Sequence, residues 1–213
     1  MLEQAYLSSS DPNIQVEWFL SLTQFRDGRT LLKNTDFAYV FSGMEEGEFV
    51  APNHDQLQNL PFNCVPNNVH SILYEKGIIG NPYYRFEELK QLWVGLSDWK
   101  MECFVKRLTC KSCLLIFEGL DTVATVKING KISRCCDNMF QYYIIDMSDH
   151  LINNSKIHIE IDFKSSLVEC RERLEKHTQL EQYEIPCPSY TRDFDTRGRN
   201  FLRKSGKQFS IVM

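Results

Sequence analysis

Short apolar segments separated by polar turns run through most of the chain. Between residues 156 and 163 every second position is isoleucine or phenylalanine. A period of two predicts a β-strand with one buried face and one hydrated face. Further strands are predicted at residues 37–41, 99–107, 113–119, 122–128, 131–134 and 140–147. The run at 113–119 is apolar at most positions, which predicts a strand buried on both faces.

The segments between these strands predict how they connect. Asn129-Gly130 is typical of a two-residue hairpin turn with positive φ at both positions. Short strands with turn signals between them favour an all-β, mainly antiparallel sandwich. One or two short helices are expected to cover it. One is predicted from apolar residues at helical spacing, namely Phe86, Leu89 and Trp93. The other is predicted to begin at the capping pair Ser165-Ser166 and to cover one edge of the sandwich.

Aromatic residues are concentrated between positions 80 and 99. This segment holds five aromatics in twenty residues, or 25%, against 12% for the whole chain. Large rings bury much area each, so we expect the segment to anchor a core or a contact surface. Pro82 predicts an extended backbone at the entry to it.

The composition narrows the class of protein. The chain has 213 residues, 43% of them hydrophobic and 24% charged, with a net charge of −4. These values are typical of a globular domain with an additional segment. Because no basic stripe is present, we expect no nucleic-acid partner. No apolar run is long enough to predict a membrane span. The first residues lack the basic and apolar regions of a signal peptide, so the chain as written is expected in the cytoplasm.

Few residues outside the apolar pattern suggest chemistry. Eight cysteines are present, and we expect at most one or two disulfides. A zinc site would need two spaced pairs, and the adjacent Cys135 and Cys136 chelate one ion poorly, so no metal is predicted. No cofactor motif appears either. Asn153 begins a glycosylation triplet and is a candidate glycosylation site, although such triplets are common by chance. His70 is more simply explained as a packed side chain than as a catalytic one.

Several motifs together indicate a family. The aromatic segment reads Asn-Pro-Tyr-Tyr-Arg-Phe at 81–86, Trp-Val-Gly-Leu at 93–96 and Asp-Trp at 98–99. Related motifs occur at residues 65–73, 117–124, 128–130, 137–140 and 200–204. This set resembles the N-terminal domain of animal β-mannosidases, lysosomal exo-glycosidases of the β-galactosidase-like clan. The resemblance implies a jelly-roll sandwich of the galactose-binding-domain-like type. It divides the chain into an unplaced segment at 1–36, the jelly-roll domain at 37–210 and a divergent end at 211–213.

The resemblance also implies what this chain does. The parent enzymes hydrolyse terminal non-reducing β-D-mannose residues during glycoprotein degradation in the lysosome. Their two catalytic glutamates lie on a later barrel domain, so we expect a truncated chain that is inactive alone. Glu87 and Glu88 cannot replace that pair, because adjacent side chains point apart.

The resemblance leaves partners and one alternative to be tested. The expected partners are a mannose-containing oligosaccharide, through the parent enzyme, and a catalytic barrel within the full chain. Arg203 and Lys204 are substrate-binding candidates, and a basic loop packing against the next domain is the simpler interpretation of them. The alternative function is a free-standing, non-catalytic jelly-roll module that binds a glycan or a protein.

Overall fold

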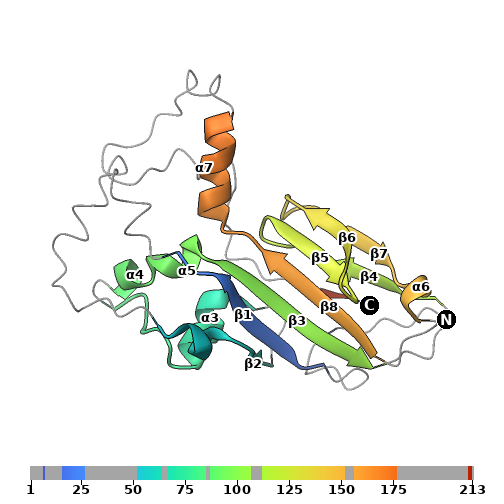
Figure 1. Cartoon of the computed structure of the whole chain (residues 1–213), viewed down its shortest axis with the longest axis horizontal. Helices are drawn as coiled ribbons and strands as arrows, with labels where there is room; N and C mark the ends of the chain where they lie inside the picture. The colour runs from blue at the N-terminus through green and yellow to red at the C-terminus, as the bar shows by residue number, and fades with distance from the viewer. Residues whose placement is uncertain are drawn as a thin grey trace.

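The computed structural model describes residues 7, 16–26, 52–63, 67–84, 87–106, 112–151, 156–176 and 211–212. They form two antiparallel sheets (Figure 1). The larger sheet has the strand order β2 (Leu60–Phe62), β1 (Trp18–Gln24), β3 (Asp98–Lys106), β8 (Lys156–Phe163), β5 (Ala124–Ile128) and β6 (Lys131–Cys136). The smaller sheet has the order β7 (Tyr143–Asp146), β4 (Leu114–Phe117) and β9 (Ile211–Val212). The prediction of a mainly antiparallel all-β fold is confirmed.

Short helices connect and flank the strands. They are η1 (His54–Leu57), α3 (Val69–Glu75), α4 (Glu87–Lys90), α5 (Leu92–Leu96), α6 (Ser148–Leu151) and α7 (Ser166–Lys176). The described residues thus contain more helices than the one or two expected. Of the helices in this described part of the chain, none is long and apolar enough to cross a membrane.

The alternation of apolar residues forms the core. In β8, Ile157, Ile159 and Ile161 are at most 1% exposed, and the residues between them are only partly buried. Successive side chains point to opposite faces of a strand, so the apolar set of β8 faces inward. One buried cluster joins Val126 of the larger sheet to Phe117 of the smaller sheet. The two sheets therefore enclose a common core, as a sandwich requires.

The prediction for β4 is corrected in one respect. The strand was expected to be buried on both faces, but Leu114 is 49% exposed and Ile116 is half-buried. Their neighbours Leu115 and Phe117 are fully buried. Only one face of this strand meets the core, because the pleat sends alternate side chains to opposite sides.

The hairpin between β5 and β6 forms as predicted. Asn129 has φ 50° and Gly130 has φ 78°, the left-handed values that a mirror-image turn requires. The Asn129 side chain also accepts a hydrogen bond from the backbone N–H of His158, with Oδ1 and N 2.9 Å apart. The turn is therefore tied to the neighbouring strand β8.

Strand β1 lies before residue 37, where the jelly-roll domain was expected to begin. It nevertheless pairs with both β2 and β3 and so lies inside the larger sheet. Trp18 and Leu20 are at most 1% exposed, and the Trp18 Nε1 donates to the Leu7 carbonyl oxygen at 2.9 Å. At the other end, β9 pairs with β4, although 211–213 were expected to lie outside the domain. Strand pairing therefore extends the folded unit beyond both expected boundaries.

The aromatic segment divides between core and surface. Trp93 and Trp99 are 3% and 4% exposed, their ring centroids lie 5.9 Å apart, and the Trp99 Nε1 donates to the Val94 carbonyl oxygen. In contrast, Tyr83 is 94% exposed and Tyr84 is 58% exposed. The tryptophans thus anchor the core, and the tyrosines lie on the surface.

The final described helix differs from its prediction in place. Ser165 caps α7, because its Oγ accepts from the Val168 backbone N–H at 3.2 Å. The helix continues from the end of β8 beyond the larger sheet and packs against α5 (Figure 1). Asp98 helps to hold this junction by accepting from the Ser165 backbone N–H at 2.7 Å. The helix was expected to cover one edge of the sandwich, but it does not lie along a sheet edge.

Candidate functional site

None of the candidate site residues predicted from the sequence lies within the described structure. Arg203, Lys204 and Asn153 lie outside the described residues. His70 lies in the first turn of α3 and is half-buried. Glu87 lies on α4, where its Oε1 is 2.9 Å from the Lys90 Nζ. Neither His70 nor Glu87 was predicted to be catalytic, and the two residues lie on separate helices.

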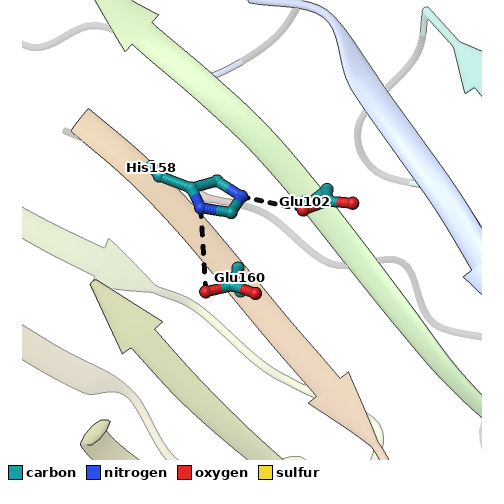
Figure 2. A group of neighbouring side chains, drawn as sticks. All are labelled: Glu102, His158 and Glu160. Atoms are coloured by element: carbon teal, nitrogen blue, oxygen red, sulfur yellow. Dashed lines mark hydrogen bonds and ion pairs between the residues drawn. The ribbon is translucent and has the colours of Figure 1, made fainter. Parts of the chain in front are cut away.

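A different group of polar side chains meets on the outer face of the larger sheet. Glu102 of β3 and Glu160 of β8 are directly opposite each other in the strand register. His158 lies two residues before Glu160, so it shares the same face. Its Nε2 is 2.8 Å from the Glu102 Oε2, and its Nδ1 is 3.7 Å from the Glu160 Oε2. Figure 2 shows the imidazole ring between the two carboxylates.

The charge state of Glu102 follows from its neighbours. Burial alone raises the pKa of its carboxyl, but hydrogen bonds from Lys100 and His158 lower it, and the lowering prevails. The Lys100 Nζ is 2.8 Å from the Glu102 Oε1. A carboxyl with a lowered pKa is ionised near neutral pH and cannot donate a proton as a general acid. The Glu102 carboxylate is therefore suited to pair with a bound cation or with a protonated imidazole.

Packing holds the imidazole ring in place. The rings of Phe104 and His158 are stacked, with centroids 4.4 Å apart and planes 11° apart. The Lys156 Nζ lies over the Phe104 ring, 4.2 Å from its centroid. The His158 side chain is still 27% exposed, so solutes reach it. The alternation of residues 156–163 placed His158 and Glu160 on the hydrated face of their strand, but it did not reveal which residues of β3 lie opposite them.

A depression lies beside the helices at the other end of the larger sheet. It has a volume of about 690 Å³, within the usual range for small-molecule sites. Its lining includes Gln56, Lys76, Glu87, Lys90, Gln91 and Trp93. Gln91 is 4% exposed; its Nε2 donates to the Gly80 carbonyl oxygen at 2.9 Å, and its Oε1 has no hydrogen-bond partner. An unpaired buried oxygen lowers the stability of a fold by about 1–3 kcal/mol. Gln91 therefore gives this wall of the depression a polar atom that lacks a hydrogen-bond donor.

Comparison with known proteins gives the family. Residues 48–211 match the family model described as glycosyl hydrolase 2 galactose-binding domain-like. This match extends over more than half of the 213 residues. The chain belongs to this glycosyl hydrolase 2 family. The galactose-binding-domain-like fold implied by the sequence motifs is therefore confirmed.

Curated relatives of this glycosyl hydrolase 2 chain are β-mannosidases. The chain is 37% identical over 150 residues to the β-mannosidase of Capra hircus and 38% identical over 146 residues to that of Bos taurus. Each match covers 66% of this chain and 16% of the relative, so the match spans about one sixth of the relative's length. The relationship to β-mannosidases inferred from the motifs is thereby confirmed.

A solved structure shares the fold. The crystal structure of the β-D-mannosidase from Dictyoglomus thermophilum superimposes with a TM-score of 0.64 at 20% identity. The superposition covers 99% of this chain and 22% of that chain. At this identity the likeness establishes the arrangement of strands and helices.

Proposed function

We propose that this chain serves as the N-terminal, non-catalytic jelly-roll domain of a β-mannosidase-type glycosidase. The observation that carries the proposal is the family match over residues 48–211, supported by 37% identity to a mammalian β-mannosidase. The substrate of the intact enzyme would be the terminal non-reducing β-D-mannose of a glycan. The lysosome, where such glycans are degraded, is the proposed location.

The carboxylates of the described residues support a non-catalytic role. Glycoside hydrolysis needs a carboxylate and a carboxylic acid with a raised pKa on either side of one sugar. Glu102 and Glu160 are the acidic pair brought together on the larger sheet, but one imidazole ring lies between them. The lowered pKa of Glu102 also opposes a role as proton donor. The pair therefore lacks both the room and the protonation that hydrolysis requires.

The smaller sheet supports a contact with another domain. Its outer face and the adjoining turn expose four large side chains, at 49% to 63% of their surface: Leu114, Phe140, Tyr142 and Ile144. Ile144 pairs with Ile116 across the strands, which makes the apolar area continuous. Exposed apolar patches of this kind mark contact surfaces in many proteins. We propose that the remainder of a β-mannosidase-length polypeptide, including its catalytic barrel, covers this face.

An assay of the isolated chain tests the proposal. The purified chain is incubated with a chromogenic β-mannoside beside an intact mammalian β-mannosidase as the positive control. We expect no release of the chromophore by the chain. Release that persists after removal of contaminating enzymes would overturn the non-catalytic role.

A second assay tests the domain contact. The chain is mixed with a mammalian β-mannosidase that lacks its matching segment, and complex formation is measured by size-exclusion chromatography. We expect the wild-type chain to form a complex and Ile144→Lys to bind more weakly. Glu172→Lys, at an exposed position on α7, is the matched control and should bind like wild type. Equal binding by Ile144→Lys would exclude this face as the contact.

The depression lined by Gln91 favours one alternative, a free-standing glycan-binding module. Its polar side chains, including the unpaired Gln91 amide oxygen, offer hydrogen-bonding groups to a ligand rich in hydroxyls. Titration of the isolated chain with β-1,4-mannobiose, followed by NMR, distinguishes the two functions. Shifts limited to the lining residues would favour the module, whereas an unchanged spectrum favours the domain of a larger enzyme.

A further inference from the structure

The outer face of the larger sheet carries three side chains of metal-binding type. One ligand atom each from Glu102, His158 and Glu160 can be chosen so that all three lie within 4.8 Å of one another. Figure 2 shows that they come from two adjacent strands, β3 and β8. We propose that these three residues bind a divalent transition-metal ion of the zinc class. This differs from the expectation of no metal, which considered the cysteines only.

One of the two contact distances is close to that between ligands of a shared ion. Zinc lies about 2.0–2.2 Å from imidazole nitrogen and carboxylate oxygen, so two ligands of a tetrahedral ion are about 3.4 Å apart. The His158 Nδ1 and the Glu160 Oε2 are 3.7 Å apart, near this value. The His158 Nε2 and the Glu102 Oε2 are 2.8 Å apart, a hydrogen-bond distance. The two carboxylates lie beside different ring nitrogens, so the side chains would have to turn until one nitrogen and both carboxylates face the ion. The three ligand atoms, which lie within 4.8 Å of one another, would then draw together to about 3.4 Å.

The local charges favour a cation. Glu102 and Glu160 are directly opposite on antiparallel strands, a position where like charges repel. Lys100 is paired with Glu102 at 2.8 Å and offsets one of the two charges. Lys127, which is opposite Glu160 in the register, is paired with Asp162. The cluster therefore keeps one net negative charge when the imidazole is neutral, and a divalent ion would relieve the repulsion.

The donor set selects the kind of ion. Imidazole suits zinc, copper, iron and nickel, whereas a purely carboxylate site suits magnesium, calcium and manganese. One imidazole with two carboxylates therefore suits zinc and its neighbours in the first transition series. The Lys100 contact would orient Glu102, and the Phe104 stack would orient the ring. Binding replaces the proton, where one is present, on the ligating ring nitrogen and releases it to solvent.

The consequence would be a link between two central strands. The ligands come from β3 and β8, which pair along their full length in the larger sheet. Three protein ligands leave at least one position of a tetrahedral ion for water. Because the His158 side chain is 27% exposed, an ion reaches the site without unfolding of the sheet.

Zinc titration of the whole chain tests the proposal. Chelator-treated protein is titrated with zinc chloride, and the imidazole ¹⁵N signals of His158 are followed by NMR. This readout reports the histidine and is insensitive to zinc bound by thiols. We expect saturable shifts of the His158 ring and a rise in melting temperature. In isothermal titration calorimetry, His158→Gln should weaken zinc binding at this site by about tenfold or more.

Matched variants make the test specific. Glu160→Gln keeps the size of the side chain, removes one ligand and should also weaken binding. His54→Gln makes the same change as His158→Gln at an exposed position on η1 and should leave binding unchanged. The proposal fails if excess zinc leaves the ¹⁵N chemical shifts of the His158 ring unchanged. It also fails if His158→Gln and His54→Gln bind zinc equally. Neither outcome bears on the proposed glycosidase domain, so the two proposals fail separately.

Discussion

Replacement of Leu20 by alanine tests whether the early strand β1 is part of the folded domain. Leu20 is fully buried and lies in register between Leu60 of β2 and Met101 of β3. A buried leucine cut back to alanine loses its transfer free energy and leaves a cavity, which together cost about 2.7–5 kcal/mol. This is a large part of the total stability of about 5–15 kcal/mol expected for a domain. We therefore expect a strongly destabilised or unfolded variant.

The expected shift is measurable by circular dichroism during thermal unfolding. Each kcal/mol lowers the melting temperature by about 2–4 °C in a domain of 150–250 residues, so the variant should melt about 5–20 °C lower. Thr23→Ala is the control, because Thr23 lies on the same strand with an exposed side chain. It should change stability by less than about 0.5 kcal/mol. Equal melting of Leu20→Ala and Thr23→Ala would refute the placement of β1 in the core of the sheet.

Three further predictions test the packing and the ionisable groups. Gly119→Ala should destabilise the fold by about 1–3 kcal/mol in urea unfolding, because a Cβ there would lie 2.8 Å from a backbone carbonyl oxygen. Burial raises the pKa of Glu169, but the hydrogen bond and charge of Arg173, with a nearby lysine, lower it more. The ionised Glu169 carboxylate therefore stabilises the fold above pH 4.5, the ordinary pKa of the group. This stabilisation is lost as the pH falls through the lower pKa of the folded state. Glu169→Gln should thus be less stable than wild type near neutral pH and similar to it in strong acid. Burial raises the pKa of Cys136 to about 11, whereas Cys135 is exposed, so iodoacetamide should label Cys135 first and Cys136 only after unfolding.

Clear results would contradict each of these three predictions. A Gly119→Ala variant as stable as wild type would mean that the adjoining turn moves away without cost. A stability difference for Glu169→Gln that grows in acid would mean that the sign of the pKa shift is reversed. Equal labelling of Cys135 and Cys136 in the native chain, located by peptide mass spectrometry, would mean that Cys136 is not protected.

The sequence alone determined the local elements. The bounds of β8 agree with the prediction for residues 156–163, because a strict period of two is a local property. The hairpin at Asn129-Gly130 was predictable for the same reason, since few residues accept positive φ at both positions. The motifs around residues 81–99 were long enough to indicate the family that the comparison found.

The tertiary structure alone decided how distant segments meet. Strand β1 pairs with β3, and this contact leaves no mark on the sequence pattern of residues 18–24. The exposure of Leu114 depends on which face of β4 the core covers. Glu102 and His158 are 56 residues apart in the chain, yet their side chains are 2.8 Å apart. Periodicity shows which face of a strand a residue occupies, but strand order and register are properties of the whole sheet, and they alone bring these side chains together.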